Sequence, residues 1–95
     1  MNLANVALLE DFAKRHAKSA APLARWKLAA SAATWKSFAE VRAAFPSVDM
    51  VKPHTLIFNI GGSHYRLVVK ATFSEGLLKI EGVYTHAEYD KLNLR

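Results

Sequence analysis

Residues 55–73, TLIFNIGGSHYRLVVKATF, decide the fold of this chain. Two runs rich in β-branched and aromatic residues flank Gly61-Gly62, which is typical of a β-hairpin with a two-residue turn. From residue 64 onward apolar and polar side chains alternate, as they do in a strand with one buried face. A two-residue turn would pair Phe58 with Tyr65, apolar against apolar, so we predict antiparallel strands at 55–60 and 64–73.

A third strand is predicted at 77–85, after a turn at Glu75-Gly76. This turn would pair Ala71 with Ile80 and would set Glu81 directly opposite Lys70. One face of the sheet would then be apolar and covered by helices, whereas the other would stay polar, as antiparallel sheets permit. The predicted polar face gathers Asn59, His64, Arg66, Lys70, Glu81 and Thr85.

The first half of the chain is rich in alanine and is predicted to be helical. Apolar residues recur at helical spacing over residues 5–17, and a second amphipathic helix follows with Pro22 at its first position. Ser37 to Glu40 has the pattern of a capping box for a short third helix that ends at Pro46. A short strand over the first four residues is an open possibility. The sequence therefore predicts one α+β domain over residues 1–95.

The amino-acid composition indicates the kind of partner that the protein binds and the cellular compartment in which it works. The chain has 95 residues, a net charge of +5 and a pI near 9.8, which favours a polyanionic partner over the alternative of a merely basic, soluble protein. There is no cysteine, so disulfide and thiolate chemistry is excluded, and we expect a reducing cytoplasm. We recognise no signal peptide and no apolar run of the ~20 residues that span a membrane.

Residues 85–91, THAEYDK, carry the side chains best suited to chemistry. Thr85 is a plausible N-cap for a short C-terminal helix, on which His86 would share a face with Tyr89 and Asp90. Cleavage of RNA through its 2′-hydroxyl needs a base, an acid and a cation that holds the phosphate. An imidazole is suited to proton transfer near neutral pH, and a guanidinium binds two phosphate oxygens at once, so Arg66 is the candidate clamp.

Simpler interpretations compete with this one. Arg66 could serve only to solvate the sheet, and His86 only to begin a helix. His64 could be a plain surface residue, and His54 fits a loop. A metal site built from these histidines lacks the spacing of known ligand sets, so we expect no metal and no cofactor.

Several segments, in this order, resemble the HigB family of toxins. They are residues 35–37 (WKS), 41–49 (VRAAFPSVD), 58–62 (FNIGG), 65–68 (YRLV) and 85–91 (THAEYDK). The resemblance implies a RelE-like fold, with two N-terminal helices packed on a small, mostly antiparallel sheet and a short C-terminal helix. It also implies an mRNA interferase of a type II toxin-antitoxin system that cuts mRNA without a metal, commonly on the ribosome, and a helix-turn-helix antitoxin of the HigA type.

The resemblance also assigns roles to residues. Arg66, His86 and Tyr89 match the positions expected to be catalytic, and the acid and base roles of His86 and Tyr89 are left open. Lys91 is expected to help at the edge of the site. The predicted polar face of the sheet, independently of the resemblance, supplies Lys70, His64 and Asn59 as the other residues expected to bind RNA or its phosphates. One departure is Glu81, where the family usually has a basic residue; facing Lys70, it would reduce the positive charge near the phosphate. The alternative function is therefore a basic RNA- or ribosome-binding protein without turnover.

Overall fold

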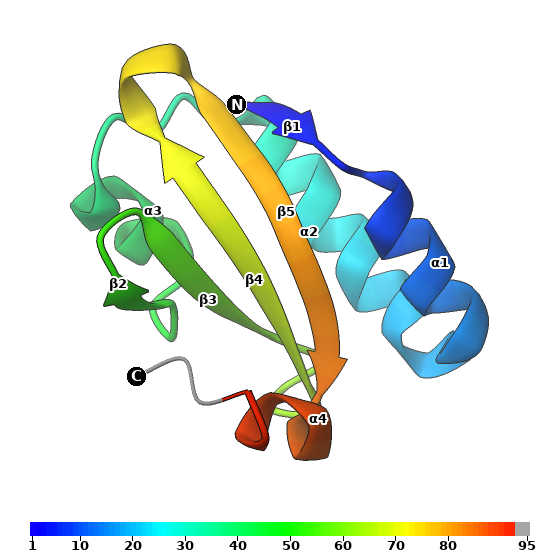
Figure 1. The fold of residues 1–95 in the computed structure, drawn as a ribbon. Helices are drawn as coiled ribbons and strands as arrows, with labels where there is room; N and C mark the ends of the chain where they lie inside the picture. Colours follow the sequence, from blue (N-terminus) through cyan, green and yellow to red (C-terminus); the bar gives the residue numbers. More distant parts are fainter. Residues whose placement is uncertain (93–95) are drawn as a thin grey trace.

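The computed structural model describes residues 1–92 and has an α+β fold with a five-stranded mixed sheet (Figure 1). The strands lie in the order β1-β5-β4-β3-β2, and all neighbouring pairs are antiparallel except β1 and β5. The elements are β1 (Asn2–Ala4), α1 (Ala7–Arg15), α2 (Ala20–Ala32), α3 (Phe38–Ala44), β2 (Asp49–Lys52), β3 (Thr55–Ile60), β4 (Tyr65–Thr72), β5 (Leu77–Thr85) and α4 (His86–Asp90). The predicted fold class, a mostly antiparallel sheet with helices, is confirmed.

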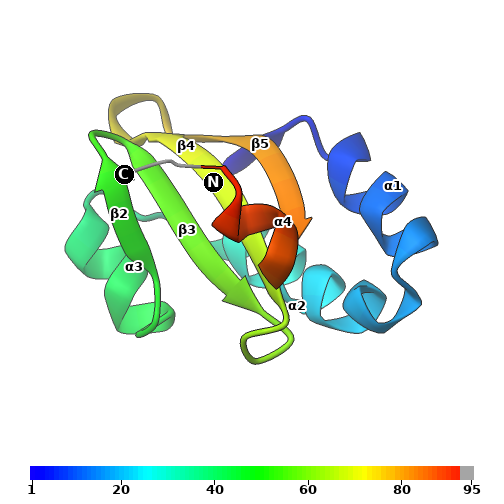
Figure 2. The same cartoon turned by 60° about the horizontal axis from the view of Figure 1, so that its bottom comes forward.

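The helices α1 and α2 lie against one face of the sheet, and α4 lies across the other (Figure 2). Phe12 of α1 and Trp26 of α2 are almost fully buried, and the Trp26 ring meets Phe58 of β3 edge to face at 5.3 Å. These contacts bury the apolar side of the predicted hairpin, as its alternation requires. None of the helices within residues 1–92 is long and apolar enough to cross a membrane.

The helix predictions are confirmed with one change of boundary. α1 lies within 5–17, and α3 begins after Ser37, whose hydroxyl accepts the backbone N–H of Glu40. α2 begins at Ala20 rather than at Pro22, so Pro22 is the third residue of its helix. A proline is tolerated there because the first N–H groups of a helix have no partner within the helix.

The predicted register between β3 and β4 is wrong by two residues. Phe58 pairs with Leu67 rather than with Tyr65, and Tyr65 pairs with Ile60. The turn has four residues, 61–64, because both glycines have positive φ and the His64 N–H donates to the Gly61 carbonyl at 3.4 Å. A shift of two residues keeps every side chain on its predicted face, so the faces are correct although the pairs are not.

The predicted register between β4 and β5 is also wrong. A short 3₁₀ turn, Phe73–Glu75, ends β4 early, so Ala71 pairs with Leu78 rather than with Ile80. A β-bulge then falls between Val68 and Val69, and Glu81 is the residue of β5 that is skipped. Lys70 therefore lies opposite Lys79, and the proposed neutralisation of Lys70 by Glu81 is not supported.

Two further strands, β1 and β2, form the edges of the sheet on either side of the three predicted strands. β1 confirms the strand that was left open at the first residues, and it pairs in parallel with β5. β2 was not predicted, because it is short, irregular between Met50 and Lys52, and followed at once by Pro53. The face that carries α4 is also less polar than expected, since the paired residues Ile57 and Val68 are buried there.

Candidate functional site

The end of β5 carries α4 onto the open face of the sheet. Thr85, the last residue of β5, pairs with Tyr65 at the start of β4, and the next N–H, of His86, donates to the His64 carbonyl at 3.1 Å. The first residue of α4 is thus tied to the turn between β3 and β4. As a result, α4 lies beside β4 (Figure 2), and its residue Tyr89 lies beside Arg66 of that strand.

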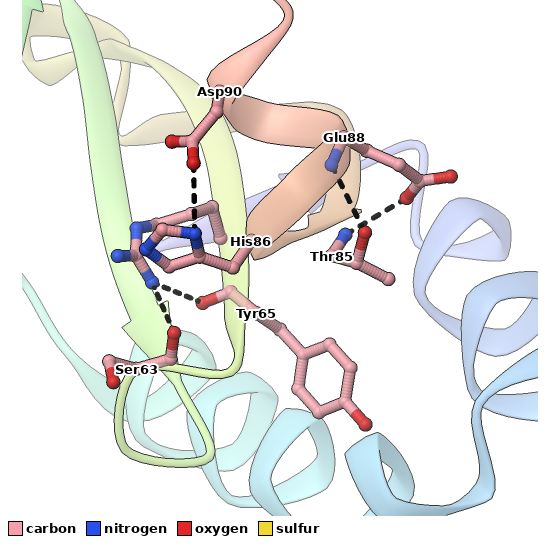
Figure 3. A network of polar contacts seen from close by, with 7 residues as sticks. Ser63, Tyr65, Thr85, His86, Glu88 and Asp90 are labelled. Atoms are coloured by element: carbon pink, nitrogen blue, oxygen red, sulfur yellow. Dashed lines mark hydrogen bonds and ion pairs between the residues drawn. The ribbon is translucent and has the colours of Figure 1, made fainter.

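A complete capping box begins α4 (Figure 3). The Thr85 hydroxyl accepts the Glu88 N–H at 3.2 Å, and the Glu88 carboxylate accepts the Thr85 N–H at 2.9 Å. The hydrogen bond from the Thr85 backbone lowers the pKa of Glu88 below its ordinary value of 4.5, and nearby His16 and Arg15 add to this effect. The box stabilises a helix of one turn, which would be marginal by itself.

Arg66 projects from β4 between Asn59 of β3 and Tyr84 of β5. One guanidinium nitrogen donates to the carbonyl of Ser63 at 2.8 Å and more weakly to that of Tyr65 at 3.4 Å. The guanidinium carbon lies 5.8 Å from the centre of the Tyr89 ring. These contacts hold the side chain over the sheet while its other N–H groups stay available to a ligand.

The His86 ring and the Asp90 carboxylate are in contact along α4 (Figure 3), and they form an ion pair when the imidazole is protonated. The Nδ1 atom of His86 lies 3.0 Å from a carboxylate oxygen of Asp90, and the two side chains are 55% and 60% exposed. The carboxylate orients the ring, whose Nε2 atom has no hydrogen-bond partner among residues 1–92. An exposed imidazole held in one orientation can donate or accept a proton at a bound ligand.

A pocket of about 520 Å³ lies beside Arg66 on the open face of the sheet. Its volume is in the range of about 300–1,000 Å³ that is usual for small-molecule sites. The walls come from the sheet, from α4, from α3 and from the segment that leads into β2. The lining residues are Phe38, Arg42, Pro46, Ser47, Val48, Asp49, Met50, Ile57, Asn59, Arg66 and Tyr89.

Of the residues predicted from the sequence, Asn59, Arg66 and Tyr89 line this pocket together. His86 is on the same short helix as Tyr89, and Lys91 ends that helix as its C-cap.

Two of the predicted residues lie elsewhere. His64 is exposed in the turn. Lys70 lies four residues from Arg66 along β4, which is about 13 Å in a strand. Lys70 therefore does not line the pocket, and its place is farther along the same face.

The far wall of the pocket was missed by the sequence analysis. Phe38 and Arg42, one turn apart on α3, both line it, and so does the segment 46–50. The helix itself was predicted, and the spacing of four residues showed that these two side chains share a face. Nothing in the local pattern indicated that this face would lie beside β3 and β4.

Within residues 1–92 there is no group of three or more histidine and carboxylate side chains placed to bind a metal ion. The polar groups of the site are instead two arginines, a tyrosine, an amide, the carboxylate of Asp49 and a neighbouring imidazole–carboxylate pair. Such a set is suited to an anionic ligand and to proton transfer.

A comparison with family models identifies the class of protein that this fold and site belong to. Residues 19–92 match the model described as HigB_toxin, RelE-like toxic component of a toxin-antitoxin system. The chain is thus a toxin of the toxin-antitoxin class. More particularly, it belongs to the HigB toxin family, as its sequence segments suggested.

Curated relatives agree with this membership. The chain is 29% identical over 92 residues to the mRNA interferase toxin HigB of Escherichia coli strain K12, a match that covers 95% of this chain and 88% of the relative. The proteins named mRNA interferase HigB in Escherichia coli O157:H7 and in Shigella flexneri match with the same identity and coverage.

Proposed function

We propose that this chain is an mRNA interferase, an endoribonuclease that acts as the toxin of a type II toxin-antitoxin pair. Membership of the HigB family supports the toxin role, and the names of the relatives support cleavage of mRNA. The observation that carries the proposal is the approach of α4 to β4, which brings Tyr89 to 5.8 Å from the Arg66 guanidinium, with the His86–Asp90 pair on the same helix.

The reaction that suits this site is attack by the RNA 2′-hydroxyl on the adjacent phosphorus. The bond from the 2′ oxygen to phosphorus forms, the bond from phosphorus to the 5′ oxygen breaks, and the products end in a 2′,3′-cyclic phosphate and a 5′-hydroxyl. One group takes the 2′ proton and another gives a proton to the departing 5′ oxygen. The site supplies both kinds of group without a metal.

Each catalytic residue has a separate part in this proposal. Arg66 holds the scissile phosphate with its free N–H groups and stabilises the charge that grows on its oxygens in the transition state. His86, oriented by Asp90, moves a proton at one of the two oxygens. Tyr89 orients or deprotonates the nucleophile, and its ring also supports the Arg66 guanidinium.

The remaining predicted residues extend the RNA-binding surface. Asn59 can contact the nucleotide in the pocket. Lys91, the C-cap of α4, and His64, in the turn before β4, do not line the pocket and would contact neighbouring parts of the RNA. Lys70 faces Lys79 across β4 and β5, so the two cations form a continuation of the positive surface along the sheet. These residues would bind phosphates away from the cleaved bond.

The proposed function also implies an antitoxin partner, a substrate and a cellular compartment. We expect a helix-turn-helix antitoxin of the HigA type to neutralise the toxin, and mRNA on the ribosome to be the substrate. Both would place the protein in the cytoplasm. The fold would be RelE-like, with α1 and α2 as its two N-terminal helices.

The decisive experiment is cleavage of a reporter transcript by the purified protein in the presence of EDTA, with and without ribosomes. We expect cleavage by the wild type, strong loss in His86→Ala and Arg66→Ala, and products with cyclic phosphate ends. Lys27→Ala on α2, on the opposite side of the sheet, is the control for a general loss of positive charge. RNA binding and toxicity that persist unchanged in His86→Ala and Arg66→Ala would contradict the proposal and would favour a binding protein without turnover.

A further inference from the structure

We propose that Arg42 of α3 is a substrate-binding residue, and that it holds the RNA phosphate next to the one held by Arg66. This inference rests on the proposed function and specifies how the substrate lies in the site. Its basis is that a second arginine, from an element far from the catalytic helix, lines the pocket that contains Arg66.

The Arg42 side chain is available to a ligand. It is exposed and has no ion pair or hydrogen-bond partner among the side chains and backbone groups of residues 1–92. Its neighbour Val41 is fully buried, so α3 is anchored and presents Arg42 from a fixed position. Arg66, by contrast, is already held by two carbonyls and by the Tyr89 ring.

The pocket lining contains two guanidinium groups and one carboxylate, that of Asp49, so the lining side chains carry a net positive charge that favours further anions. An RNA strand supplies such anions in series, because each nucleotide is flanked by two phosphates. The volume of about 520 Å³ is suitable for one nucleotide between the two arginines. The walls also contain the aromatic residues Phe38 and Tyr89, against which a base of any identity can stack. The strand would thus cross the pocket from β4 toward α3.

Binding to an uncleavable RNA tests this independently of catalysis. The probe is a short fluorescent oligonucleotide with 2′-O-methyl groups, which lacks the attacking hydroxyl, and the measurement is Kd by anisotropy over a series of salt concentrations. We expect Arg42→Ala to weaken binding about tenfold and to reduce the slope of log K against log salt by about 0.7, the contribution of one phosphate contact on a single strand. Arg42→Lys should retain the slope and recover part of the affinity.

The control is Lys27→Ala, which removes an exposed cation from α2, the helix on the other face of the sheet. Equal effects of Lys27→Ala and Arg42→Ala would overturn the proposal, because they would reflect net charge alone. A change of base preference in Arg42→Ala with an unchanged salt slope would also overturn it, since Arg42 would then contact a base. Circular dichroism of each variant checks that the fold is intact.

Kinetics on unmodified RNA separate this inference from the proposed function. Arg42→Ala should raise KM about tenfold with kcat nearly unchanged, whereas Arg66→Ala should lower kcat. If the wild type cleaves RNA and Arg42→Ala binds and cleaves as the wild type does, only the role of Arg42 fails. If binding depends on Arg42 but the wild type cleaves no RNA, the proposed function fails and the phosphate contact stands.

Discussion

The guanidinium carbon of Arg66 lies 5.8 Å from the centre of the Tyr89 ring, although Arg66 is on the central strand β4 and Tyr89 is on α4, which follows β5. The Thr85–Tyr65 pairing and the capping box of α4 bring them together. This contact joins two distant segments of the chain, β4 and α4, into one site.

Replacement of Arg66 should reduce the rate of the chemical step. We expect Arg66→Ala to lower kcat by roughly 10²–10³-fold, the usual loss when one donor to a transition-state anion is removed. Arg66→Lys should recover only part of the activity, because an ammonium retains the charge without the planar fork. The measurement is single-turnover cleavage of a short RNA. Lys70→Ala is the comparison, since Lys70 is about 13 Å farther along β4. If Lys70→Ala lowered kcat as much as Arg66→Ala does, Arg66 would have no special role in holding the scissile phosphate.

Removal of the His86 imidazole should reduce the rate of cleavage far more than removal of the charge on Asp90. His86→Ala should reduce cleavage by about 10²–10⁴-fold, as expected for a general acid or base. Asp90→Asn removes the charge that faces Nδ1 at 3.0 Å but keeps the shape of the side chain. Because exposed ion pairs contribute at most about 1 kcal/mol, we expect only a roughly two- to fivefold loss. Comparable losses in the two variants would mean that Asp90 takes part in the chemistry itself.

The lowered pKa of Glu88 predicts a loss of stability in acid. A carboxyl whose pKa is lower in the folded state stabilises the fold above its unfolded pKa, and this contribution is lost as the pH falls through the folded value. For Glu88 the loss should therefore begin near the ordinary value of 4.5 and continue below it. Thermal unfolding of the wild type and of Glu88→Gln between about pH 7 and about pH 3 measures it. The two melting temperatures should converge at low pH, and a constant difference would contradict the prediction.

The cap itself can be tested at Thr85. Thr85→Ala removes the hydroxyl that accepts the Glu88 N–H at 3.2 Å, and we expect a cost of about 1 kcal/mol. Since α4 carries His86 and Tyr89, cleavage should fall as the helix frays, whereas Thr85→Ser should behave as the wild type. Urea unfolding and cleavage, measured on the same samples, check both effects. Full activity in a destabilised Thr85→Ala would show that the site does not depend on the order of α4.

The four-residue turn predicts different tolerances at its two glycines. Gly61 and Gly62 both have positive φ, so any β-branched residue should cost about 1–2 kcal/mol at either position. At Gly61 a Cβ would lie in ordinary contact with the Tyr65 ring, at 3.4 Å, so the methyl groups of a valine would be crowded against it, whereas at Gly62 a Cβ would meet nothing within 4 Å. Gly61→Val should therefore lower the melting temperature more than Gly62→Val. Equal melting temperatures would show that Tyr65 moves aside at no cost.

Local patterns of residues were enough to predict the helices, the main strands and the side of the sheet to which each strand residue points. The alternation in residues 64–73 placed Leu67 and Val69 in the core and Arg66 on the open face, because the direction of a side chain in a strand depends only on its position in the alternation. The caps at Ser37 and Thr85 were likewise predictable, since each is formed by residues within one turn of helix.

The strand register, the β-bulge and the α3 wall of the pocket could not be predicted in this way, because they depend on contacts between distant segments. The pairs across β3, β4 and β5 depend on turns that are longer than two glycines or a Glu-Gly pair suggested, and the bulge moves Glu81 away from Lys70. Arg42 reaches the Arg66 pocket because α3 packs beside the β2 edge of the sheet. Such contacts join segments distant in the chain, and their geometry is set by the packing of the whole core, which no local pattern of residues contains.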